Sequence, residues 1–267
     1  MGVQRENFNF SIVTEEEILK LLKGLNVSKA TGCDKVSAKF LKDGTYEIVE
    51  PLTYIINLSL RTQTVPDDLK EARVVPLFKK GDKNVEGYYR PVSILPVISK
   101  LLERIVHNQV YFYLGENNMI YKQQSGFRQS FSTKTTLTFL TDSIRFNTDN
   151  GFYTGLVLID LQKAFDTVDH ELLLTKLCAI GFNKSTVSWF KSYLSNRAQY
   201  VDVNGSISSR GNLTCGVPQG SILGPLLFLI YVNDMVTSVD CDLYLYADDS
   251  TLMVKGKDIK EIVGSKH

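Results

Sequence analysis

The chain has 267 residues, of which 43% are hydrophobic and 22% are charged, a composition typical of a globular protein with a sizeable core. Its net charge of +1 excludes a protein that binds nucleic acid through bulk charge alone. The longest apolar run, residues 222–232, contains Gly224 and Pro225 and is too short to span a bilayer, and no secretory signal precedes it. We therefore expect an intracellular protein that is neither secreted nor bound to a membrane.

Charged residues are unevenly distributed along the chain. Residues 61–110 contain nine lysines and arginines against six acidic residues. Residues 211–254 contain no lysine or arginine, and five aspartates fall among them. A basic region and an acidic region on one chain favour a polyanion bound at one place and a metal ion bound at another.

The four cysteines (Cys33, Cys178, Cys215 and Cys241) are widely spaced and form no Cys-x-x-Cys pair. The three histidines do not cluster with them in the sequence. This pattern predicts reduced thiols in a packed interior rather than a zinc site or a disulfide.

The first predicted element is a helix, in which Thr14 and Glu17 form a capping box before a series of apolar residues on one face. Apolar residues at three- and four-residue spacing predict further helices over residues 46–60, 98–115, 132–147, 170–180 and 185–194. Residues 73–78 predict a short strand, and residues 79–82 predict a turn after it.

The second half of the chain alternates between strands and helices. Gly155 to Asp160 is a continuous apolar run that ends in an acid, which predicts a buried strand. Residues 199–205 predict a hairpin that turns at Asn204-Gly205, and the apolar segment after Ser221 predicts a buried helix. Because no regular βαβ period appears, we expect an α/β protein of mixed topology rather than a Rossmann sheet.

Residues 242–254 contain the most informative pattern of the chain. Apolar and polar residues alternate on both sides of a two-residue break, which predicts a β-hairpin with Asp248 and Asp249 at its tip. Two carboxylates held so close repel each other, and each would prefer to be protonated. A divalent cation removes that penalty, since hard oxygen ligands suit Mg²⁺.

A third carboxylate, Asp160, ends the strand predicted upstream. Alone it would be best explained as the cap of a turn or helix. If that strand and the acidic hairpin are neighbours in one sheet, three carboxylates converge and can hold two Mg²⁺ ions about 4 Å apart. Such a pair of ions suits in-line attack on phosphorus, a reaction that needs little else from side chains beyond positioning and charge.

Three motifs resemble those of reverse transcriptases, in the family's order. The active-site hairpin of the family is resembled by Tyr246-Ala-Asp-Asp249. The end of the family's first catalytic strand is resembled by Asp160-Leu-Gln-Lys-Ala-Phe-Asp166, and its nucleotide-binding segment is resembled by Gly216-Val-Pro-Gln-Gly-Ser221. Further motifs resemble the polymerases of non-LTR (LINE-type) retrotransposons of the jockey/CR1-like group. These are residues 28–34, 37–42, 79–82, 89–93 and 124–128.

The resemblance implies an α/β fold of the α+β type, comprising the fingers and palm of a right-hand polymerase. The palm would contain a small antiparallel sheet backed by helices, and the thumb would be absent. The implied domains are an N-terminal helical extension over residues 1–65, the first part of the fingers over 66–154, and a palm over 155–267. A fingers insertion near residues 171–214 would interrupt this palm, and we expect the chain to be a fragment truncated before the thumb.

The resemblance also implies the metal site. Asp160 and Asp248 would be the metal ligands together with the backbone of Leu161, and Asp249 would be the third catalytic acid. The cofactor would be two Mg²⁺ ions, for which Mn²⁺ is a possible substitute.

The implied nucleotide-binding residues fall in several motifs. The residues that would bind the incoming dNTP are Lys79, Lys80, Arg90, Ala164, Phe165, Gln219 and Gly220. Phe165 matches the family's steric gate, whose ring would clash with a ribose 2′-OH, although a plain core aromatic is an alternative. Arg128, Pro218 and Tyr246 would contact template or primer. Ordinary surface charges remain an alternative for the lysines and arginines.

The function implied is RNA-directed DNA polymerase, which extends a DNA 3′-OH on an RNA template with dNTPs, in the nucleus for the parent element. One alternative is a group II intron or retron reverse transcriptase. A viral RNA-dependent RNA polymerase is disfavoured by Phe165, because enzymes that use rNTPs need room for the 2′-OH. Another alternative, of a different class, is an inactive retroelement remnant.

Overall fold

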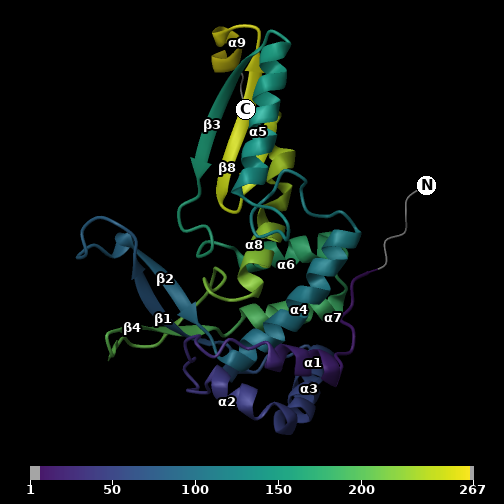
Figure 1. Cartoon of the computed structure of the whole chain (residues 1–267), viewed down its shortest axis with the longest axis vertical. Coiled ribbons are helices and arrows are strands. Elements are labelled where there is room, and N and C mark those ends of the chain that lie inside the picture. The colour runs from purple at the N-terminus through teal and green to yellow at the C-terminus, as the bar shows by residue number, and fades with distance from the viewer. Residues whose placement is uncertain (1–6, 265–267) are drawn as a thin grey trace. The chain divides into compact units, whose positions relative to one another are not determined.

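The computed structural model describes residues 7–264, in which the chain forms two compact units. Unit 1 comprises the chain up to residue 113 together with 165–224, and unit 2 comprises 114–164 together with the chain from 225 onward. Two of the three boundaries fall within helices, because α4 (Val97–Glu116) and α8 (Leu223–Val232) each continue from one unit into the other. The mixed α/β class with small sheets that the sequence predicts is confirmed (Figure 1).

Apart from α2, the helices of unit 1 begin and end close to the predicted positions. They are α1 (Glu15–Lys23), α2 (Ala38–Asp43), α3 (Thr45–Thr62), α6 (His170–Ala179) and α7 (Lys184–Leu194), with most of α4. The predicted capping box is present, since the Glu17 amide donates to Thr14 Oγ1 at 3.3 Å and the Thr14 amide donates to Glu17 Oε2 at 2.9 Å. The six-residue helix α2 was not predicted from the sequence, because it is too short to show a period.

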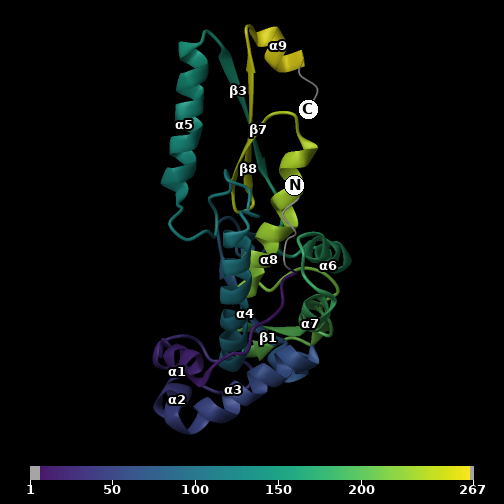
Figure 2. The same cartoon turned by 90° about the vertical axis from the view of Figure 1, so that its right-hand side faces the viewer.

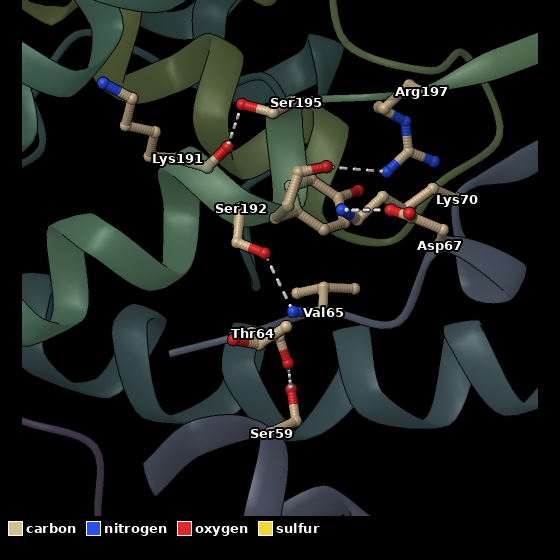
Figure 3. A network of polar contacts seen from close by, with 10 residues as sticks. Ser59, Thr64, Val65, Asp67, Lys70, Lys191, Ser192, Ser195 and Arg197 are labelled. Atoms are coloured by element: carbon tan, nitrogen blue, oxygen red, sulfur yellow. Dashed lines mark hydrogen bonds and ion pairs between the residues drawn. The ribbon is translucent and has the colours of Figure 1, made fainter. Parts of the chain in front are cut away.

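Aromatic residues of α7 form the centre of unit 1. Trp189 and Phe190 are fully buried and meet edge to face, with ring centroids 5.2 Å apart. The Trp189 indole donates to Ser59 Oγ at 3.1 Å, so its single polar group is satisfied inside the core. Ser59 belongs to α3, so this hydrogen bond connects α3 with α7. Figure 3 shows a second hydrogen bond between the two, in which the amide of Val65, just after α3, donates to Ser192 Oγ of α7 at 2.9 Å. These polar contacts fix how α3 and α7 pack against each other.

The sheet of unit 1 has the order β2-β1-β4-β5, with β6 paired to β4. Its strands are β1 (Glu71–Phe78), β2 (Tyr89–Ile94), β4 (Ala198–Val203), β5 (Ser206–Ile207) and β6 (Gly211–Asn212). β1 pairs antiparallel with β2 and parallel with β4. The predicted hairpin turn at Asn204-Gly205 is confirmed, with φ of 53° and 89° at its two residues.

Unit 2 is built on a three-stranded antiparallel sheet. β8 (Asp249–Gly256) lies between β3 (Tyr153–Asp160) and β7 (Asp242–Tyr246). The helix α5 (Thr133–Asp149) runs along this sheet and contacts β3 and β7, and α9 (Ile259–Gly264) lies at its far end (Figure 2). A Cβ at Gly155 would lie 2.6 Å from Ile262 Cγ2, so glycine lets α9 pack directly on β3.

Two burial predictions were wrong. The apolar strand β3 is largely exposed, with Val157 at 52% and Leu158 at 78% of their accessible surface. These consecutive residues project from opposite faces of the sheet, so the described elements cover neither face of β3 there, whereas the other outer strand, β7, is largely buried. The cysteines are free thiols, but Cys178 and Cys215 are exposed rather than interior. An apolar run and a wide cysteine spacing do not show which neighbours cover a residue.

The predicted buried helix after Ser221 is confirmed as α8. Most of its apolar side chains are buried, including Leu223, Leu227 and Phe228. Nowhere in residues 7–264 is there a helix with both the length and the apolar character needed to cross a bilayer. Three short 3₁₀ segments complete the described chain: η1 (Asp67–Leu69), η2 (Glu86–Tyr88) and η3 (Asn233–Ser238).

Candidate active site

The acidic hairpin of unit 2 consists of β7, β8 and the turn between them. Tyr246 pairs with Asp249 as the last cross-strand pair, so the two-residue turn consists of Ala247 and Asp248. Asp249 therefore lies at the start of β8, one position further from the turn than the sequence pattern suggests. Ala247 adopts the left-handed conformation, with φ of 58°, which reverses the chain direction within two residues.

Asp160 lies directly across the sheet from Asp249. The register of β3 with β8 runs from Tyr153 opposite Gly256 to Asp160 opposite Asp249. Residues directly opposite in an antiparallel pair have Cβ atoms about 4.5–5.5 Å apart, so these two carboxyl groups are neighbours. The predicted convergence of the two strand ends in one sheet is thus confirmed.

Electrostatics in this cluster favour a bound cation. The pKa of Asp249 is raised above its ordinary value by partial burial, then by the charge of Asp248 and then by that of Asp160. Within residues 7–264, no three carboxylate, histidine or cysteine side chains are already arranged as a complete metal site. The three carboxylates nevertheless fit Mg²⁺ by their donor chemistry, since oxygen ligands suit this ion and its charge would relieve their repulsion.

Leu161 and Ala164 follow Asp160 and end this part of unit 2. Ala164 is buried and Leu161 is half-buried, and burial alone does not test whether either residue lines a metal or nucleotide site. Their predicted roles in the metal and nucleotide sites therefore stay predictions.

Tyr246 and Arg128 also belong to unit 2. Tyr246 ends β7 and is half-buried. Arg128 Nη1 donates to the carbonyl oxygens of Tyr121 and Gln124, at 3.2 and 3.0 Å, and the guanidinium lies 4.1 Å above the Phe131 ring. These contacts hold the loop before α5, and contact of Arg128 with a template stays a prediction.

The predicted nucleotide-binding segment of unit 1 packs against the chain that follows Phe165. The Val217 amide donates to the Phe165 carbonyl and the Gly216 amide to the Val168 carbonyl, both at 2.8 Å. Gln219 Nε2 donates to Asp166 Oδ1 at 3.2 Å. The structure therefore brings Phe165 and Gln219 together, and it shows that Asp166, which was not among the predicted site residues, orients the Gln219 side chain.

Gly220 is required by a backbone contact within unit 1. Its φ is +117°, and a Cβ there would lie 2.4 Å from the Ser93 carbonyl oxygen. The Ser93 amide also donates to the Gln219 carbonyl at 2.6 Å, which ties the segment to β2. Pro218 accepts a hydrogen bond from Ser221 Oγ at 2.8 Å through its carbonyl, so it helps turn the chain into α8. Contact of these residues with a base or sugar stays a prediction.

The predicted triphosphate-binding cations lie on the β1–β2 hairpin of unit 1. Lys79 and Lys80 follow β1 directly, Arg90 pairs with Leu77 across the hairpin, and all three cationic side chains are exposed. The Lys79 amide donates to the Tyr88 carbonyl at 2.8 Å, which extends the pairing beyond the strands. Exposed lysine and arginine side chains can donate charge-assisted hydrogen bonds to phosphate oxygens, and contact of these three residues with a triphosphate stays a prediction.

A buried carboxylate, Glu103 of α4, anchors the start of α8. Its Oε2 accepts hydrogen bonds from the Ile222 and Leu223 amides, and its Oε1 accepts one from the Tyr193 hydroxyl at 2.9 Å. Burial raises the pKa of Glu103, and these hydrogen bonds together with the Arg197 charge oppose that rise. The sequence did not single out this residue, because one acid in an amphipathic helix usually faces solvent.

Comparison with known proteins identifies the family. Residues 78–265 match the family described as Reverse transcriptase (RNA-dependent DNA polymerase). The chain belongs to this family, as the three motifs predict.

Its relatives are proteins of mobile elements. The chain is 35% identical over 248 residues to "Probable RNA-directed DNA polymerase from transposon BS" of Drosophila melanogaster, which covers 89% of the chain and 27% of that protein. It is 33% identical over 258 residues to "RNA-directed DNA polymerase from mobile element jockey" of the same species, covering 93% and 28%. These similarities confirm the predicted non-LTR group. The chain spans only about a quarter of the length of these relatives.

Proposed function

We propose that this chain carries the catalytic centre of an RNA-directed DNA polymerase of a non-LTR retrotransposon. It would transfer nucleotides from dNTPs onto a DNA 3′-OH along an RNA template. The observation that carries this proposal is the position of Asp160 opposite Asp249, with Asp248 in the adjoining turn. Membership in the reverse transcriptase family supports it, while the activity of a full-length protein comes to this chain only as part of the proposal.

The carboxylates would hold the divalent cations. Asp160 and Asp248, with the carbonyl of Leu161, would be the ligands for two Mg²⁺ or Mn²⁺ ions, and Asp249 would lie beside the primer end. When bound, such ions supply Lewis-acid stabilisation of the phosphate charge and lower the pKa of the attacking hydroxyl. The carboxylates position the reacting groups and, by their own repulsion, bind cations more tightly than separate acids would.

Residues of unit 1 would bind the incoming nucleotide. Lys79, Lys80 and Arg90 would neutralise its triphosphate, and Phe165 would lie beneath its sugar and exclude a 2′-OH. Gln219 and Gly220 would contact the nucleotide, and Ala164 would line the pocket from the segment after β3. Pro218, Arg128 and Tyr246 would contact the template or primer.

The subdomain assignment belongs to the same proposal. The β3-β8-β7 sheet suits the palm of a right-hand polymerase, because it is a small antiparallel sheet. The β1–β2 hairpin suits the fingers. The proposed boundaries stay those predicted from the sequence, with a helical extension over residues 1–65, fingers over 66–154 and a palm over 155–267 interrupted near 171–214. The parent element would act in the nucleus.

Primer extension on poly(rA)/oligo(dT) with Mg²⁺ tests the function. We expect dTTP to be incorporated in preference to UTP by the wild-type chain. We expect Asp248→Asn to lower the rate by at least about 10²-fold, since electrostatic stabilisation of a transition state commonly contributes that much. Asp242→Asn is the matched control, because Asp242 is an exposed carboxylate at the opposite end of β7, and it should retain activity.

Two results would contradict the proposal. Folded wild-type protein that makes no product would support an inactive retroelement remnant. Extension that survives Asp248→Asn would show that the acidic hairpin does not carry the chemistry.

A further inference from the structure

The segment that precedes α5 lies directly on the turn of the acidic hairpin, within unit 2. The Leu245 amide donates to the Gln123 carbonyl at 3.0 Å, and the Ser125 amide donates to the Leu245 carbonyl at 2.9 Å. Gly126 makes this approach possible, because a Cβ there would lie 2.1 Å from the Ala247 nitrogen. The contact is therefore between two backbones, with one side chain, that of Gln124, enclosed between them.

Gln124 binds both backbone polar groups of Ala247. Its side chain is buried, with 2% of the residue exposed. Oε1 accepts from the Ala247 amide at 3.0 Å and from the Gly126 amide at 2.8 Å, while Nε2 points to the Ala247 carbonyl at the longer distance of 3.5 Å. Ala247 lies beyond the last cross-strand pair, so the hairpin itself offers these groups no ladder partner.

Ala247 needs this support because of its backbone conformation. A left-handed φ costs a residue with a Cβ about 1–2 kcal/mol, and turns of this kind usually contain glycine, asparagine or aspartate. The buried hydrogen bonds from Gln124 favour the one conformation in which both Ala247 groups face it. Asp248 and Asp249 follow Ala247 directly, so the same hydrogen bonds determine where the two carboxylates project from the backbone.

We propose that Gln124 is a positioning residue, which holds the turn of the acidic hairpin in the conformation that places Asp248 and Asp249 for catalysis. A neutral amide suits this position because it supplies an acceptor and a donor at once. A carboxylate of the same length would lack the donor and would add a negative charge beside two others. The catalytic part of this inference rests on the proposed polymerase function, whereas its conformational part does not.

Gln124→Met tests the proposal, because methionine nearly preserves the side-chain volume and removes the hydrogen bonds. We expect kcat for primer extension to fall about 10- to 100-fold, as an approximately 1 Å displacement of reacting groups can cost about that much. The KM for dNTP should change less than about twofold, since the hydrogen bonds of the Gln124 side chain go to the Ala247 turn and to Gly126. The matched control is Gln123→Met, because Gln123 offers the hairpin only its backbone carbonyl.

A rescue variant separates positioning from packing. Glycine adopts the left-handed conformation without strain, so Ala247→Gly in the Gln124→Met background should recover part of kcat. A loss caused by poorer packing would not be recovered in this way. Wild-type kcat in Gln124→Met, or an equal loss in Gln123→Met, would overturn the proposal.

Amide hydrogen exchange tests the conformational part without any need for activity. The Ala247 amide should be protected in the wild-type chain and exchange at least about tenfold faster in Gln124→Met, with Gln123→Met unchanged. If the wild-type chain makes no product, the proposed function fails while this measurement still decides the role of Gln124. Equal Ala247 exchange in the wild-type chain and Gln124→Met would refute the positioning role even in an active enzyme.

Discussion

Asp249 lies where the negative charge of the acidic hairpin is most concentrated, beside Asp248 in the chain and opposite Asp160 in the sheet. Its carboxyl group is exposed enough to be reached by solvent and by a cation, yet its pKa is raised by partial burial and by both neighbours. Repulsion among the three carboxylates therefore destabilises the folded chain, and a bound divalent ion would relieve it. Active-site residues often lower stability in this way, and removing one commonly stabilises the fold while destroying function.

This repulsion predicts a pH-dependent effect of Asp249→Asn. Because the folded-state pKa is raised, the folded chain binds more protons than the unfolded chain between the two pKa values, so stability falls as pH rises through that window. We expect Asp249→Asn to remove this loss and to stabilise the chain at pH 7, by only about 0.5 kcal/mol because exposed carboxylates are screened. Urea unfolding at pH 4 and pH 7 measures the difference, which should shrink in high salt.

The same variant should respond less to divalent cations. Mg²⁺ that binds only the folded chain raises the melting temperature, and Asp249→Asn should show a smaller rise than the wild type. A variant that is less stable than the wild type at pH 7 but not at pH 4 would contradict the proposed repulsion.

Phe165 is the residue that would decide sugar selection. Its carbonyl accepts from the Val217 amide, so the backbone beneath the ring is held by the predicted nucleotide-binding segment. We expect Phe165→Ala to improve rNTP use relative to dNTP by about 10- to 200-fold, the range typical of steric discrimination in a pocket. Single-nucleotide incorporation with each substrate measures the ratio. Phe112→Ala, at a residue of α4 that is 68% exposed, is the control and should leave it unchanged.

Among the elements, α8 begins at a contact with a residue far away in the sequence. Glu103 of α4 satisfies the Ile222 and Leu223 amides at its first turn, next to the local cap in which the Gly224 amide donates to Ser221 Oγ at 2.9 Å. The same carboxylate accepts from the Tyr193 hydroxyl of α7, so one buried group connects α4 and α7 with the start of α8, through residues that all belong to unit 1. The segment with Gln219 and Gly220 enters α8 directly, and its conformation depends on this anchor.

Glu103→Ala should therefore destabilise the chain strongly. We expect a loss of about 3 kcal/mol in the free energy of unfolding, since removing one partner of a buried polar network leaves the others unpaired. Glu103→Gln should cost less, because it keeps one acceptor for the amides. Urea unfolding measures both variants, and Glu116→Ala, at an exposed glutamate of the same helix, is the control. Equal stability of Glu103→Ala and Glu116→Ala would contradict this role.

The pH dependence of the Glu103 variants provides a second check. The pKa of Glu103 is raised, so the folded chain retains this proton longer than the unfolded chain as pH rises. Its contribution to stability is greatest below the unfolded-state pKa and declines as pH rises toward the folded-state value. The Glu103→Gln variant should lack this decline.

Local signals predicted the helices better than the strands. The helices α1, α3 and α5 are present as predicted. Their signals, which are the capping box at Thr14 and the apolar periodicity of residues 46–60 and 132–147, depend only on neighbours three or four positions away. The strands β2 and β6 were missed, because each is defined by its pairing with a distant strand. The exposure of β3 was mispredicted because its composition cannot reveal which distant elements cover its two faces.

At the scale of the whole molecule, the predicted site residues divide between the two units. Asp160, Asp248 and Asp249 belong to unit 2, whereas Phe165, Gln219 and the cations of the β1–β2 hairpin belong to unit 1. The boundary falls between Ala164 and Phe165, inside a single sequence motif. The motif Asp160–Asp166, which is continuous in the sequence, thus contributes residues to both units.

The sequence by itself determined the family, the three carboxylates and most helices, because each depends on residue type and on spacing along the chain. Only the tertiary structure decided that Asp160 faces Asp249, that Glu103 anchors α8 and that Gln124 holds the Ala247 turn. Each of these contacts joins residues more than eighty positions apart. Contacts of this kind follow from how strands and helices pack, and the chemistry of a single segment does not encode which distant partner it meets.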